Sequence, residues 1–181
     1  MLSLSKHDDR LGVAAFASYA TAPHSNRCDL WHRQPCGMDG SMKYVCDAPE
    51  RKTWFRIETV TEAERESTVM DHAVAKYFKR ERETAVRSYK PTSTAYIEQN
   101  IGLEAHIQRT MPLFLTLRDA AGEALATAML PPRGRDTPVF KIIIVGSGNG
   151  DPYPEHEGAI RALGKHCGLT LERVRCYPYA R

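Results

Sequence analysis

The stretch from Val139 to Leu169 constrains the fold of this chain more than any other part of the sequence. Four β-branched residues, Ile142 to Val145, are followed at once by glycine, which is typical of a short strand buried on both faces. Pro154 suits the first turn of a helix, where its missing N–H would have no partner. The stretch therefore predicts a strand, a glycine-rich turn, a helix that ends at Gly168, and a closing strand through Leu171, Val174 and Cys176.

The predicted turn contains three glycines, Gly146, Gly148 and Gly150, which let the backbone turn sharply and leave amide groups uncovered. A helix N-terminus behind such a turn favours an anion, because its free N–H groups and the helix dipole both attract negative charge. We expect these glycines to hold a phosphate, with Arg133 and Arg135 of the preceding loop as further cations. The alternatives are a turn without a ligand and a solvated loop. The spacing matches neither a Walker-type P-loop nor a Rossmann fingerprint.

The composition is that of a soluble globular protein, with 42% hydrophobic and 26% charged residues in a chain of 181. Its apolar runs are too short to span a membrane, and a net charge of +3 does not by itself require nucleic acid. The five cysteines are an odd number without an export signal, which favours free thiols and a cytoplasmic location. Association with the cytoplasmic face of the inner membrane is compatible with this location.

Residues 1–50 differ in pattern from the rest and predict a loosely ordered N-terminal arm ahead of one domain at 51–181. Histidine and cysteine recur four residues apart in the arm, which is compatible with zinc, but two prolines interrupt a helix there and no C-x-x-C pair occurs. These residues are His24, Cys28, His32 and Cys36.

Between the arm and the glycine-rich turn, alternation and capping signals predict a mixture of strands and helices. Thr61 and Glu64 form a candidate capping box at the start of one long helix. The basic last turns of this helix favour a solvent-exposed face, and a DNA-facing surface is the alternative. Few helices and mixed strands indicate an α+β domain. The predicted elements are a strand from Thr53 to Val60, the helix to Ser88, a strand from Ser93 to Gln99, a helix or irregular segment from Ile101 to Thr110, and a hairpin of Leu113–Arg118 and Glu123–Leu130 turning at Asp119–Gly122.

The helix of the first stretch carries a more specific pattern, G-A-I-R-A-L-G-K-H-C-G-L from Gly158 to Leu169. It resembles the G-x-x-R helix of the ParB/sulfiredoxin superfamily, and the matching residues are Gly158 and Arg161. The resemblance implies a ParB/sulfiredoxin-like mixed sheet and an arginine that helps to hold a phosphate. The residue before Arg161 is Ile160, where that family often has a polar residue or cysteine. On the residues alone, Arg161 is also compatible with surface pairing on a helix face that carries Glu157, Arg161 and Lys165 at a spacing of four.

A second resemblance covers about Lys52 to the C-terminus. The runs K-T-W-F-R-I-E-T, Y-I-E-Q-N-I-G-L-E-A-H-I-Q-R-T-M-P-L-F-L and A-T-A-M-L-P-P-R-G resemble the plasmid fertility-inhibition and oncogenic suppression proteins, the FiwA and Osa type. This resemblance implies a protein that hydrolyses ATP and cleaves DNA. It implies a role in blocking DNA transfer through a type IV secretion system, on the transferred strand docked at the coupling protein.

If the chain is such an ATPase and DNase, water attacks phosphorus while Arg161 and the turn amides stabilise the developing charge. His156 is then a candidate general acid or base, with Glu157 as a further catalytic candidate. Asp151 and Glu155 are candidate Mg²⁺ ligands, and Glu98 is a candidate to bind metal or orient water. Each of these residues also has a purely structural interpretation. The alternative functions are a non-catalytic inhibitor that blocks the secretion machinery by occupancy, and a DNA-binding module without hydrolysis.

Overall fold

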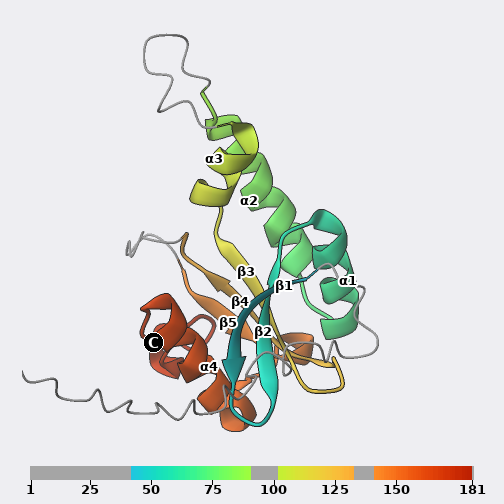
Figure 1. Cartoon of the computed structure of the whole chain (residues 1–181), viewed down its shortest axis with the longest axis vertical. Coiled ribbons are helices and arrows are strands. Elements are labelled where there is room, and N and C mark those ends of the chain that lie inside the picture. Colours follow the sequence, from blue (N-terminus) through green and yellow to red (C-terminus); the bar gives the residue numbers. More distant parts are fainter. Residues whose placement is uncertain (1–41, 91–101, 133–140, 181) are drawn as a thin grey trace, which may run out of the picture. The chain divides into compact units, whose positions relative to one another are not determined.

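The computed structural model describes residues 42–90, 102–132 and 141–180. These residues form an α+β fold around an antiparallel sheet whose five strands lie in the order β1-β2-β3-β4-β5 (Figure 1). The strands are β1 (Lys43–Ala48), β2 (Lys52–Ile57), β3 (Leu113–Arg118), β4 (Ala124–Leu130) and β5 (Ile143–Val145). The α-helices are α1 (Val60–Met70), α2 (Val74–Ser88), α3 (Leu103–Thr110) and α4 (Tyr153–Cys167), with short 3₁₀ turns η2 (Ser147–Asn149) and η3 (Arg173–Arg175).

The α+β class is confirmed, whereas the sheet differs from the expected mixed one because all of its named strands pair antiparallel. Strand β1 also begins at Lys43, ahead of the point where the sequence predicts the first strand. In the described ranges no helix combines the length and the apolar character needed to cross a membrane. The ParB/sulfiredoxin assignment and the boundary at residue 50 stay predictions.

The sheet is the middle layer of three, and β3 lies at its centre with every residue buried. Leu115 and Leu117 face α4 and the C-terminal segment, where Trp54 of β2 donates its indole N–H to the carbonyl oxygen of Ala159 at 2.9 Å. Phe114 faces the opposite way and packs with Phe78 of α2. Because successive side chains of a strand point to opposite faces, this alternation requires helices on both sides of β3. Figure 1 shows α4 on one side of the sheet and α1 and α2 on the other.

The β3–β4 hairpin forms at the predicted turn. The Asp119 carboxylate accepts hydrogen bonds from the amides of Ala121 and Glu123 at 2.8 and 2.9 Å. Gly122 has a φ of +87°, the left-handed region that glycine enters without steric cost. The turn is therefore determined by local chemistry.

The capping box of α1 lies two residues before the predicted one. Thr59, not Thr61, is the N-cap, and its hydroxyl accepts from the amide of Glu62 at 3.2 Å. The Glu62 carboxylate accepts in return from the amide of Thr59 at 3.0 Å. Both sequence pairs have the spacing of a capping box, and the end of β2 at Ile57 decides between them, because the helix must begin soon after the strand leaves the sheet.

The predicted long helix is wrong, because it is broken into α1 and α2 at Asp71. Asp71 adopts the left-handed conformation, with φ 49° and ψ 53°. The Ser67 hydroxyl accepts from the amide of Ala75 at 2.9 Å and so satisfies the start of α2. The break lets both helices place apolar residues on the sheet, Ala63 and Met70 from α1 and Val74 and Phe78 from α2.

The C-terminal unit is partly as predicted. Helix α4 has Pro154 in its first turn, and Gly168 caps it in the left-handed conformation. Strand β5, however, has only three residues at the edge of the sheet, and of these only Ile144 is buried, so it is shorter and less buried than the predicted strand. The predicted closing strand is also wrong: the chain forms η3 and then a single parallel bridge between Tyr177 and Ile143.

Replacing Thr59 by alanine tests the position of the cap. We expect Thr59→Ala to lower the free energy of unfolding by about 1 kcal/mol, because the amide of Glu62 loses its partner. The matched control is Thr61→Ala, at an exposed position inside the first turn, which should change stability by less than about 0.5 kcal/mol. Chemical denaturation of both variants measures the difference, and a larger loss in Thr61→Ala contradicts the assignment.

Candidate functional site

Two backbone amides of the predicted phosphate turn donate to carbonyl groups of the same turn and are therefore not free for an anion. The amide of Gly146 donates to the carbonyl of Gly150 at 2.8 Å, and the amide of Gly150 donates to the carbonyl of Ser147 at 2.9 Å. The amide of Tyr153, in the first turn of α4, donates to the Asp151 carboxylate at 3.1 Å. A negative charge supplied by the chain itself therefore already occupies this helix N-terminus. Gly148, with a φ of +60°, shapes the turn.

Asp151 and Glu155, the predicted metal ligands, are not joined by a third candidate ligand among the described residues. The second carboxylate oxygen of Asp151 accepts from the Arg173 Nε at 2.7 Å, so both of its oxygens are engaged. Glu155 is exposed in the first turn of α4. Within residues 42–90, 102–132 and 141–180 no group of three or more His, Cys, Asp or Glu side chains is placed to hold a metal ion. We therefore assign no chemical step to Mg²⁺.

Of the other predicted residues of α4, Arg161 and Glu157 lie on its outer surface, whereas His156 is half-buried beside β2. Arg161 and Glu157 form an exposed ion pair at 2.9 Å, with side chains 78% and 64% exposed. His156 Nδ1 lies 3.2 Å from the Lys52 Nζ. A Cβ at Gly158 would meet Pro49 at an ordinary 3.6 Å, so packing does not demand glycine there. Glu98, Arg133 and Arg135 lie outside the described residues.

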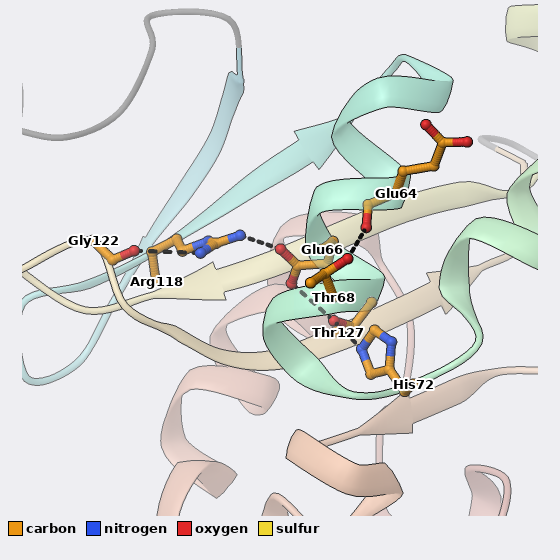
Figure 2. Close-up of polar contacts among 7 residues, drawn as sticks. All are labelled: Glu64, Glu66, Thr68, His72, Arg118, Gly122 and Thr127. Carbon is orange, nitrogen blue, oxygen red and sulfur yellow. Dashed lines mark hydrogen bonds and ion pairs between the residues drawn. The ribbon is translucent and has the colours of Figure 1, made fainter.

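A different cluster of polar side chains lies buried between α1 and the sheet (Figure 2). Glu66 of α1 forms an ion pair with Arg118 of β3, and both side chains are almost completely buried. The other Glu66 oxygen accepts from the Thr127 hydroxyl at 3.1 Å, and the His72 Nε2 lies 2.8 Å from the same hydroxyl. We call Glu66, Arg118, Thr127 and His72 the buried network.

The order of donors in the buried network determines the tautomer of His72. An ionised carboxylate only accepts, so the single hydroxyl proton of Thr127 goes to Glu66. The Thr127 oxygen must then accept from His72, which places the imidazole proton on Nε2. Burial lowers the pKa of His72, and the nearby carboxylates of Glu66 and Asp71 oppose this shift. His72 is therefore neutral at pH 7.

The buried network forms one wall of a cavity between α2 and the β4–β5 edge. The cavity has a volume of about 360 Å³, within the usual range for small-molecule sites. His72 and Thr127 line it together with Asn149, which belongs to the predicted glycine turn. Its other lining residues are mainly apolar or aromatic: Ala73, Val74, Tyr77, Phe114, Met129, Ile143, Val145, Tyr177 and Pro178.

A second hollow adjoins this cavity and carries charge. The two share Tyr77, Met129, Ile143 and Tyr177, and the second has a volume of about 440 Å³. The Arg80 guanidinium lies 4.9 Å from the ring centre of Tyr77, and the Lys141 ammonium lies 5.5 Å from that of Tyr177. Glu81 also lines the second hollow and pairs with Arg80 at 2.7 Å. We call the cavity and this hollow together the tyrosine groove.

The two tyrosines are positioned by different elements. Tyr77 and Arg80 are three residues apart on α2, so they project from the same helix face. Tyr177 is fixed through its backbone, whose amide donates to Ile142 at 2.8 Å and whose carbonyl accepts from Ile144 at 3.3 Å. The sequence offers little signal for this groove, because its residues come from segments about 100 positions apart.

The chain matches no model of a known protein family, no curated protein and no solved structure. The tyrosine groove is therefore interpreted from its own geometry. It combines an apolar cavity, two partly exposed aromatic rings and two cations, which suits a ligand with a flat ring and a negative charge.

Replacing Glu66 tests how much the buried network contributes to the free energy of unfolding. We expect Glu66→Gln to lower the free energy of unfolding by about 3–5 kcal/mol, because it leaves the buried Arg118 charge without its counter-ion. Glu157→Gln makes the same chemical change in the exposed pair and should cost less than about 1 kcal/mol. Urea unfolding of both variants provides the comparison. Similar losses in the two would contradict the buried role of Glu66.

The lowered pKa of His72 predicts a pH dependence of stability. The unfolded chain protonates this histidine near pH 6.5, while the folded chain resists protonation to a lower pH. The contribution of His72 is therefore complete above about pH 6.5 and is lost as the pH falls through the folded pKa. Between pH 7.5 and 5, the wild type should lose stability more steeply than His72→Gln in urea titrations. Parallel curves would show that His72 does not couple folding to pH.

Proposed function

We propose that the protein inhibits DNA transfer through a type IV secretion system by hydrolysing phosphate bonds in ATP and in DNA. The resemblance to fertility-inhibition and oncogenic suppression proteins motivates the biological role. The observation that carries the chemistry is the tyrosine groove, in which an apolar cavity of ligand size opens beside Arg80 and Lys141. A nucleotide has the matching parts, a flat base and charged phosphates.

In this proposal each part of a nucleotide has its own place in the groove. The base is the part suited to the cavity, because Phe114, Val74 and Met129 offer apolar contacts to its ring. The phosphates are the part suited to the second hollow, where Arg80 and Lys141 supply positive charge. In this arrangement the glycine turn borders the base through Asn149 and does not hold the phosphate.

Hydrolysis requires charge stabilisation and a group that accepts a proton. Arg80 and Lys141 are placed to stabilise the negative charge that develops on the phosphoryl oxygens. Glu81 is the carboxylate of the same hollow, and we assign it the role of orienting and deprotonating the attacking water. Arg161 lies outside the groove-lining residues, so its predicted role in holding phosphate is a separate hypothesis that the same assay can test.

The test incubates the purified protein with ATP, Mg²⁺ and either plasmid DNA or circular single-stranded DNA, and measures released phosphate and cut circles. We expect the double variant Arg80→Gln/Lys141→Gln to lose at least about 100-fold in both rates, since it removes the cations next to the reacting phosphate. Lys165→Gln, an exposed change on α4, is the matched control for loss of positive charge and should keep wild-type rates.

Each other outcome has a defined meaning. If Arg161→Ala abolishes both activities and the groove variant does not, the phosphate site lies on α4 as the family motif implies. If the wild type releases no phosphate and cuts no DNA, the proposed hydrolysis is wrong. Continued inhibition of plasmid transfer by such an inactive protein in a donor strain would then favour blocking by occupancy.

A further inference from the structure

We propose that the nucleic acid bound by the tyrosine groove is single-stranded DNA, with one unstacked base inserted into the cavity. This inference rests on the proposed function, because it specifies the DNA substrate of the same groove. It is carried by three observations: the shape of the cavity, the two exposed tyrosine rings, and the charges beside them.

The cavity favours an unpaired base. Phe114, Val74 and Thr127 are buried lining residues, so the cavity extends inward between α2 and the sheet. A base in a duplex is stacked on both faces and paired along its edge, and it reaches such a cavity only after leaving the helix. A single strand presents its bases without that cost. Asn149 lines the same cavity, and an amide side chain can both donate to and accept from a base edge.

The tyrosines provide stacking surfaces for the strand. Tyr77 and Tyr177 each line both hollows of the groove and are 37% and 51% exposed. Exposed aromatic rings beside a charged groove are the usual means of holding a single strand, because every base has a flat face to stack. The Arg80 and Lys141 cations each lie against one face of these rings, which leaves the other face for a base and supplies positive charge beside it for the phosphates of the strand.

Glu81 is the acidic residue of the second hollow and opposes the binding of an anion there. Its carboxylate pairs with Arg80 in the second hollow, so a bound phosphate must compete with it. Removing that carboxylate should strengthen the binding of an anionic strand. The same change should abolish hydrolysis if Glu81 deprotonates water. Opposite effects on binding and on turnover are not expected of a residue with a purely structural role.

The experiment measures fluorescence anisotropy of a labelled single-stranded oligonucleotide, and of the same oligonucleotide annealed to its complement. We expect the single strand to bind at least 10-fold more tightly than the duplex. Tyr177→Ala should weaken single-strand binding by roughly 5- to 100-fold, as expected for loss of one stacked base. Tyr44→Ala is the matched control, since Tyr44 is a similarly exposed tyrosine of β1 outside the groove.

The effect of charge is tested with Glu81→Gln, which should tighten single-strand binding at least about 3-fold. Glu83→Gln, on the same helix, is the control and should leave binding unchanged. Double substitution of Arg80 and Lys141 by glutamine should weaken binding and reduce its dependence on salt by roughly one to two phosphate contacts. Circular dichroism confirms that each variant is folded.

Equal affinity for duplex and single strand overturns the inference, and so does an equal effect of Tyr177→Ala and Tyr44→Ala. Its failure can be distinguished from failure of the proposed function. Hydrolysis of ATP without groove-dependent binding of the single strand leaves the proposed function standing and removes single-stranded DNA as the occupant of the groove. Groove-dependent binding of the single strand without any hydrolysis leaves the single-strand inference standing and removes the proposed hydrolysis.

Discussion

The ion pair between Glu66 and Arg118 is the interaction on which the helical layer of α1 and α2 depends. Two opposite charges removed from water are stable together and costly apart, so α1 can lie on β3 only where the two meet. Thr127 and His72 then take their positions from the remaining Glu66 oxygen. His72 follows directly after the break at Asp71, so the network connects the ion pair to the start of α2. The cavity is the space that this arrangement leaves.

The sequence predicts elements that depend on local chemistry. The Asp119–Gly122 turn, the Gly168 cap and the proline in the first turn of α4 each follow from the preferences of a few neighbouring residues. Predictions fail where two local solutions compete or where distant contacts decide. Thr59 and Thr61 offer equivalent capping boxes, and only the end of β2 selects one. The break at Asp71 is invisible to periodicity, because the stabilising contacts lie on the sheet.

The candidate site illustrates the same limit. The sequence draws attention to the glycine turn, and the structure does place Asn149 of that turn at the cavity. The charged residues predicted around it are mostly engaged in other pairs, Asp151 with Arg173 and Glu157 with Arg161. The residues that line the tyrosine groove come instead from α2, the β4–β5 edge and the C-terminal segment. Nothing short of the tertiary fold brings Tyr77 and Tyr177 together, and no motif spacing encodes it.

The bridge between Tyr177 and β5 has a consequence for the association of this protein with other chains. The outer strand of a sheet normally carries a row of free amides and carbonyls that can template a strand from another molecule. Here the backbone of Tyr177 takes up the carbonyl of Ile142 and the amide of Ile144. The C-terminal segment thus blocks strand addition along β5 while it supplies a ring to the groove. A truncation that removed it would leave an unpaired strand edge and would remove one wall of the tyrosine groove.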